Sequence, residues 1–233
     1  MRPVVRGPCP KDEQGQDISY TKYKHARGAL IKRLGENCSY CEMHLDASLA
    51  VEHIQPKQPP GSDAPIPERE LTWSNMLLAC TNCNSTKGNK EVNLNDFIWP
   101  DRDNTFMMLT YKDGGIVEAF PGQDQERAQR TIELVGLNVI PTPEQQALEA
   151  SDRRWNNRRE AWEIANASRI RLAQFDNPVM RTQIIACITG YWSIWMTVFK
   201  DDSDMLSRIL NKIPGTAVTC FDPMNGYKPI ART

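Results

Sequence analysis

The sequence lacks three features that would place it in a common functional class. Its net charge is −1 over 233 residues, so no overall positive field attracts nucleic acid to the whole surface. Its longest apolar-rich run, residues 184–199, is interrupted by polar residues and is shorter than the ~20 residues of a membrane span. The N-terminal residues contain no apolar signal-peptide core. We therefore expect a soluble, cytoplasmic protein in which any nucleic-acid contact is confined to a local patch.

Cysteine is present in seven copies, and without an oxidising compartment these residues are not expected to form disulfides. Two Cys-x-x-Cys pairs are separated by a 38-residue insert. Four thiolates brought to one point form the tetrahedral ligand set of structural Zn²⁺. Two unrelated redox pairs or disulfides are the alternative. The proposed zinc ligands are Cys38, Cys41, Cys80 and Cys83, and we expect Cys9, Cys187 and Cys220 to be buried or incidental thiols.

Polar residues with catalytic potential lie within and just after this insert. A short strand predicted over residues 49–54 carries Glu52 and His53, and a proline-rich loop follows over residues 55–70. Asn75 precedes an apolar run that enters the second cysteine pair. A helix expected over residues 82–91 carries Asn84 and Lys87. A glutamate, a histidine and two asparagines beside a metal clamp indicate a metal-assisted active site.

The flanking regions are predicted to be largely helical. An N-terminal arm precedes a basic helix over residues 18–34, which ends at Gly35 and presents either a solvated or a phosphate-contacting face. The sequence after the central module predicts a β-hairpin over residues 105–120 and a helix over residues 124–135. These patterns suggest three segments, which are residues 1–37, 38–95 and 96–233.

Two further helical segments are expected in the C-terminal part. Thr142 and Gln145 predict a capping box for a long helix that extends towards Leu172. Its buried stripe is predicted to contain Leu148, Trp155 and Trp162, with the nearby arginines mostly on the other side. Another helix is expected to start at Asp176-Asn-Pro178 and to include Trp192 and Trp195, and a last short helix follows Asp201-Asp-Ser-Asp204.

The central motif resembles that of the HNH endonucleases. The pattern is Cys-x-x-Cys, then Glu-His, then Trp-x-Asn-x-x-Leu-x-Cys-x-x-Cys-Asn-x-x-Lys, and it spans residues 38–90. This family shares a ββα-metal fold, so the resemblance implies an α+β protein in which a zinc-clamped HNH module is embedded in a mainly helical chain. More faintly, the chain resembles HNH proteins of bacterial anti-phage loci, which include the nuclease subunits of Septu systems and of some retrons.

The resemblance also implies roles for individual residues. His53 matches the general base that activates water, and imidazole suits this role because its pKa lies near neutrality. Glu52 and Asn84 match the ligands of a catalytic Mg²⁺ or Mn²⁺ ion, although Asn84 could act directly or through water. Asn75 matches a residue that orients the histidine. Lys87 is either a phosphate contact or a plain surface lysine.

The resemblance to HNH endonucleases implies a metal-dependent endonuclease that cleaves DNA more readily than RNA. The fainter resemblance to Septu proteins implies that it is the effector of an anti-phage complex with an ABC-type ATPase partner. One alternative is a zinc-stabilised binding module without catalysis, but such a scaffold needs neither Glu52, His53 nor Asn75. A second alternative is a stand-alone restriction-type nuclease. His44 follows Cys41 by three residues and could replace a cysteine ligand, although we expect it on the surface.

Overall fold

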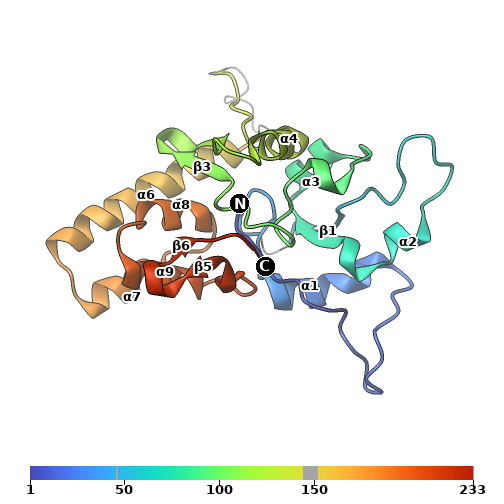
Figure 1. Ribbon diagram of the computed structural model, residues 1–233, viewed down its shortest axis with the longest axis horizontal. Coiled ribbons are helices and arrows are strands. Elements are labelled where there is room, and N and C mark those ends of the chain that lie inside the picture. Colours follow the sequence, from blue (N-terminus) through green and yellow to red (C-terminus); the bar gives the residue numbers. More distant parts are fainter. Residues whose placement is uncertain (46, 144–151, 233) are drawn as a thin grey trace.

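A computed structural model describes residues 1–45, 47–143 and 152–232 of the chain (Figure 1). Its strands form three separate two-stranded antiparallel sheets, and helices surround them. The buried apolar side chains make one contiguous core cluster. Among the described residues, no helix is both long enough and apolar enough to cross a membrane.

The central module is a hairpin followed by a helix, as the resemblance implied. Strand β1 (Ala50–His53) pairs with β2 (Met76–Ala79), and Glu52 lies opposite Leu77. Every residue of β2 is buried, which explains its continuous apolar sequence. Helix α3 (Thr81–Lys87) follows at once, because the Cys80 Sγ accepts a hydrogen bond from the Cys83 backbone N–H at 3.4 Å and so caps the first turn.

The N-terminal region differs from the prediction at its start. Helix α1 (Arg27–Leu34) is preceded by one turn of 3-10 helix, and the predicted beginning at residue 18 is wrong. The Ile18 backbone N–H instead donates to the carbonyl of Pro10, and the Tyr20 ring stacks on Trp73 with centroids 6.2 Å apart. Tertiary contacts therefore hold this segment in a loop, whereas the predicted helix end at Gly35 is confirmed.

The predicted loop between β1 and β2 contains one short helix, α2 (Pro67–Glu70), and helix α3 ends at Lys87, before the predicted end. The predicted β-hairpin is confirmed as β3 (Leu109–Lys112) and β4 (Ile116–Ala119). Helix α4 (Gln125–Val135) follows and ends at the left-handed Gly136.

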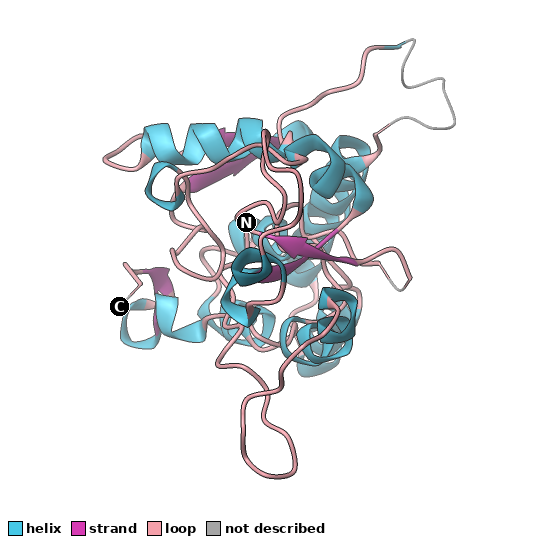
Figure 2. Cartoon of the chain, turned by 90° about the vertical axis from the view of Figure 1, so that its right-hand side faces the viewer, coloured by secondary structure: helices cyan, strands magenta, loops and turns pink. Residues whose placement is uncertain are grey.

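The C-terminal helices gather on one side of the molecule, away from β1 and α3 (Figure 1). Trp192, Phe106 and Phe221 pack against one another there, with ring centroids 5.4 to 5.8 Å apart. Figure 2 shows the molecule turned by 90°, with its short strands among helices and loops. The elements of this region are α6 (Arg154–Gln174), α7 (Pro178–Ala186), α8 (Trp192–Val198), α9 (Ser203–Leu210), β5 (Phe221–Asp222) and β6 (Lys228–Pro229).

Helix α6 corrects the predicted long helix in two ways. Residues 152 and 153 are not helical, so α6 begins at Arg154 and is not continuous from residue 142. The predicted Gln145 and Leu148 lie outside the described residues. Trp155 and Trp162 are only half-buried, so the predicted stripe is wrong. The buried face consists of Arg154, Arg158, Ala161, Ala165 and Leu172.

The single helix expected after Asp176 is in fact two helices, α7 and α8. The first is capped by Asn177, as its sequence predicted. The helical conformation is interrupted between Ala186 and Trp192. This segment contains Gly190, where a Cβ atom would lie 2.7 Å from the Glu42 carbonyl oxygen. The Glu42 carboxylate then accepts a hydrogen bond from the Ser193 backbone N–H at 2.8 Å, at the start of α8. The loop of the first cysteine pair is therefore anchored to the C-terminal helices.

Candidate active site

The four motif cysteines form one buried cluster. Their Sγ atoms all lie within 4.8 Å of one another, and those of Cys41 and Cys80 are 3.7 Å apart. A tetrahedron with Zn–S bonds of about 2.3 Å has S···S edges of about 3.8 Å, so the spacing fits a zinc ion. All seven cysteines are free thiols, which contradicts the disulfide alternative. His44 is exposed, as expected, and the four cysteines complete the set without it.

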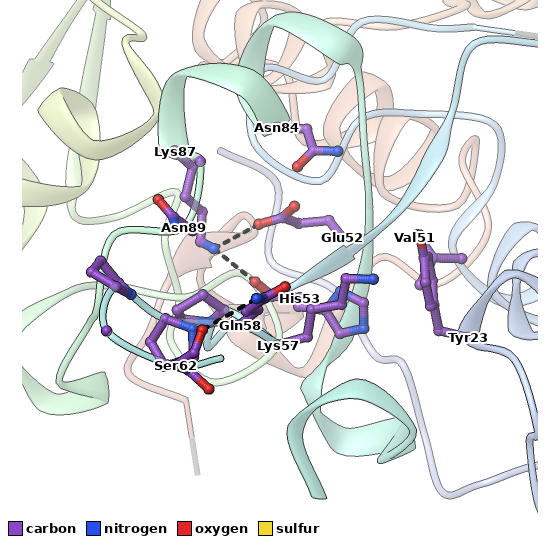
Figure 3. A pocket seen from close by; sticks show the side chains of 15 residues that line it. Tyr23, Val51, Glu52, His53, Lys57, Gln58, Ser62, Asn84, Lys87 and Asn89 are labelled. Carbon is purple, nitrogen blue, oxygen red and sulfur yellow. Dashed lines mark hydrogen bonds and ion pairs between the residues drawn. The ribbon is translucent and has the colours of Figure 1, made fainter. Parts of the chain in front are cut away.

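A cleft of about 530 Å³ lies beside the cluster, between β1, the C-terminal end of α3 and the loop after β1 (Figure 3). Four of the predicted site residues line it together, namely Glu52, His53, Asn84 and Lys87. Residues 56–62 form the opposite wall. The ββα arrangement thus brings residues far apart in the sequence to one opening.

The orientation of His53 is set by a backbone carbonyl. Its Nε2 lies 2.9 Å from the carbonyl oxygen of Glu70. A carbonyl oxygen only accepts hydrogen bonds, so Nε2 carries the proton and Nδ1 keeps its lone pair in the neutral ring. The edge of the Tyr23 ring packs against the imidazole, with centroids 4.9 Å apart. The side chain is therefore held in one tautomer and one position.

The electrostatic environment keeps His53 neutral. Burial lowers the pKa of His53, and the Glu70 carbonyl opposes this effect by favouring the imidazolium. The positive charges of Lys57 and Lys87 lower the pKa further. A neutral imidazole near physiological pH can accept a proton, which is the property required of a general base.

Asn75 acts on His53 through the backbone. Its Oδ1 accepts a hydrogen bond from the Gln55 N–H at 2.8 Å, and its Nδ2 donates to the carbonyls of Gln55 at 2.9 Å and Arg69 at 2.7 Å. The structure shows no direct bond to His53 among the described residues. Asn75 instead links Arg69, the residue before Glu70, to Gln55 just after β1 by hydrogen bonds. In this way it positions the Glu70 carbonyl that binds the imidazole.

Glu52 and Lys87 form a buried ion pair. The Lys87 Nζ lies 2.9 Å from Glu52 Oε1, and the two side chains are 1% and 4% exposed. Lys87 also donates to the His53 carbonyl oxygen at 2.7 Å (Figure 3). Burial raises the pKa of Glu52, and the positive charge of Lys87 opposes that rise. Lys87 is consequently not the surface lysine that the sequence left as an alternative.

The donor set at this end of the cleft fits a hard divalent cation. The Asn84 side chain points from α3 towards the Glu52 carboxylate (Figure 3). Apart from the ion pair with Lys87, Glu52 Oε1 has no hydrogen-bond partner among the described residues, despite its burial. Carboxylate and amide oxygens are the ligands that Mg²⁺ and Mn²⁺ prefer. A strand and a helix thus present two suitable oxygens to one space.

Three residues that contribute to the site are not among the named positions of the sequence motif, namely Tyr23, Lys57 and Glu70. Lys57 places its Nζ 4.3 Å from the centroid of the Tyr23 ring and 3.2 Å from Glu70 Oε1. Tyr23 belongs to the predicted basic helix, and Glu70 contributes through its backbone, which carries no sequence signal. Lys57 lies in the proline-rich loop, whose sequence predicted only irregular structure.

The comparison with known proteins agrees with this geometry. Residues 38–90 match the family model of the HNH endonuclease, so this segment is an HNH endonuclease domain, the catalytic domain of a class of nucleases. The chain is also similar to the Septu protein PtuB of Bacillus thuringiensis, with 28% identity over 118 residues. That match covers 48% of this chain and 40% of the relative, so the chain spans about two fifths of the length of the curated relative.

Proposed function

We propose that this protein is a metal-dependent endonuclease that hydrolyses phosphodiester bonds of DNA. The observation that carries the proposal is the arrangement of His53. Its Nε2 is bound to the Glu70 carbonyl, so the basic Nδ1 is available in a cleft that Glu52 and Asn84 also line. This arrangement lies within the segment that matches the HNH endonuclease family.

Each side chain has a distinct role in this proposal. His53 Nδ1 takes the proton from the attacking water. Glu52 and Asn84 would hold a Mg²⁺ or Mn²⁺ ion, which supplies neutralisation of the charge that develops on the phosphate and the leaving 3′-oxygen. Asn75 keeps the histidine in place through the backbone at residues 69 and 70. Lys87 favours the ionised form of Glu52 and is a candidate contact of the scissile phosphate.

We propose further that the nuclease acts in bacterial defence against phage. The similarity to a Septu protein supports this assignment. The resemblance to Septu nuclease subunits also implies an ABC-type ATPase as the partner, which would control access to the substrate. With a net charge of −1, the chain has no overall attraction for DNA, and this is consistent with a partner that helps to deliver the substrate.

A cleavage assay tests this proposal. The wild-type chain, His53→Ala and the control His44→Ala are incubated with DNA or RNA and Mg²⁺ or Mn²⁺, each with and without the candidate ATPase. We expect cleavage of DNA by the wild type and by His44→Ala, whose altered residue is exposed, and none by the folded His53→Ala. Cleavage by folded His53→Ala would contradict the assignment of His53 as the general base. If the wild type binds nucleic acid but cleaves neither polymer under any condition, the chain is a binding module.

A further inference from the structure

The cysteine cluster is covered by an arginine that lies outside the HNH segment. Arg154, the first residue of α6, is 3% exposed. Its Nη1 lies 3.0 Å from Cys83 Sγ and donates to the Val135 carbonyl at 2.6 Å. Its Nε and Nη2 donate to the Asp152 carboxylate at 2.6 to 3.0 Å. The guanidinium is thus oriented by one carboxylate and one carbonyl so that it faces a cysteine sulfur.

A second contact joins the same two segments. Asn82, between the cysteines of the second pair, donates from Nδ2 to Asp152 Oδ1 at 3.0 Å. Asp152 therefore binds both Arg154 and the cysteine loop. Asp152 and Arg154, just before and at the start of α6, are in this way connected to the first turn of α3, although 70 and 71 positions separate the contacting residues in the sequence.

The charge of the metal centre explains why an arginine is buried here. Four thiolates and one Zn²⁺ carry a net charge of −2, because coordinated thiols are deprotonated. A buried negative charge is unfavourable unless a donor or a positive group is close to it. Arg154 provides both at the Cys83 sulfur. Arg158 lies one turn later on the same buried face, where it donates to the carbonyls of Gly115 and Leu137.

The dependence is reciprocal. When the cysteines are protonated and metal-free, Arg154 is a buried cation. Among the described residues its charged contact is with Asp152, and that carboxylate is itself partly exposed. When zinc binds, the guanidinium gains a negative sulfur partner. Zinc binding and the docking of α6 therefore stabilise each other by the same free energy.

We propose that Arg154 is a positioning residue of the zinc site, which retains the metal through Cys83 and fixes the first turn of α3. Asn84 follows Cys83 directly, and Lys87 lies one turn further on, so the same contact supports two residues of the cleft. The C-terminal helical region is thereby part of the zinc site. This inference concerns zinc retention and is independent of the proposed nuclease activity.

Zinc release measures this role directly. We would compare the wild type with Arg154→Gln, Arg154→Lys and the control Arg153→Gln, which removes the same charge from an exposed neighbour. Zinc content is measured first, and then the rate of zinc transfer to a chromogenic chelator. Outer partners of metal ligands commonly change metal affinity by roughly 10–100-fold. We expect release at least about 10-fold faster from Arg154→Gln, a smaller increase for Arg154→Lys and the wild-type rate for Arg153→Gln.

Two further measurements separate this role from a general packing role. If Arg154→Gln does not fold, Asp152→Asn leaves the arginine present but removes the carboxylate that orients it, and should release zinc a few-fold faster. Hydrogen exchange of the zinc-loaded proteins should show faster exchange at the start of α6 in Asp152→Asn than in the wild type. Equal zinc release from the wild type, Arg154→Lys and Asp152→Asn would overturn the proposal. A wild-type chain purified from zinc-replete cells without zinc would overturn it as well.

Discussion

The ammonium group of Lys87 lies 2.9 Å from Glu52 Oε1, and both side chains are almost completely buried. This pair places a fixed positive charge beside the carboxylate that is proposed to bind a divalent ion. Burial alone would favour the protonated acid, and Lys87 opposes that tendency. The Lys87 charge therefore favours the ionised carboxylate, which is the form that can bind a cation.

Removal of one member of this pair should destabilise the fold strongly. Lys87→Met leaves Glu52 buried without its counter-charge and removes the donor to the His53 carbonyl. Loss of one partner of a buried ion pair costs about 3–5 kcal/mol, and we expect a decrease of this order in the free energy of unfolding, measured by urea denaturation. Lys90→Met is the matched control, because Lys90 is exposed and lies three residues after Lys87, the last residue of the same helix, and it should change stability little.

The double variant tests the pair itself. Glu52→Gln should also destabilise the protein, since it leaves Lys87 as a buried cation without a carboxylate. In Glu52→Gln/Lys87→Met neither charge is left unpaired, so the double variant should lose less stability than the sum of the two single variants. Additive losses would show that the two residues do not interact in the folded protein.

Asn75 should affect catalysis without touching the substrate. Asn75→Ala removes the bonds that fix the backbone before Glu70, so the carbonyl that holds His53 becomes free to shift. A displacement of about 1 Å at a catalytic group can cost roughly 100-fold in rate. We expect a fall of this order in kcat with little change in KM. Asn89→Ala, an exposed asparagine of the same cleft, should keep most of the activity, and equal losses in both variants would contradict the positioning role.

Local sequence patterns predicted the central module well. The elements of this module are specified by their own residues. Strand β2 is a continuous apolar run, and α3 starts after a cysteine that caps its first turn. The cysteine spacing indicated the cluster, and the strand placed Glu52 and His53 beside α3. These features depend on neighbours within a few residues or on a metal site with fixed ligand spacing.

The surroundings of the site could not be predicted from local sequence patterns, because they depend on contacts between segments that are distant in the sequence. Arg154 and Arg158 are among the arginines that were expected mostly on the side of the helix opposite the stripe with Trp155 and Trp162. They are buried because sulfur and carbonyl groups from distant segments accept their hydrogen bonds. In the same way, the Glu70 carbonyl that orients His53 has no signature in the side-chain sequence. Burial of charged groups is decided by such tertiary partners and not by helical periodicity.

The cysteine cluster should be essential for folding. Cys80→Ser removes one zinc ligand, whereas the serine hydroxyl can still cap α3 in place of the sulfur, and structural zinc contributes folding free energy directly. We expect this variant to lose its bound zinc and to show no cooperative thermal unfolding transition. Cys187→Ser is the control, because Cys187 is exposed and lies outside the cluster. A wild-type melting curve for zinc-free Cys80→Ser would exclude a structural role for the metal.

The pH dependence of cleavage should report the environment of His53. Burial and two nearby lysines lower its pKa below the ordinary value of 6.5, so the general base is lost only when the pH falls below that value. In Lys57→Met one of these positive charges is absent and the Glu70 carboxylate loses its ion-pair partner. Both changes favour the imidazolium and raise the pKa of His53. The acid limb of kcat/KM, measured from about pH 5 to about pH 9, should therefore shift to higher pH, whereas Lys112→Met, on the distant hairpin, should leave it unchanged. An acid limb that stays in place or moves to lower pH in Lys57→Met would mean that His53 is not the group whose protonation limits the reaction.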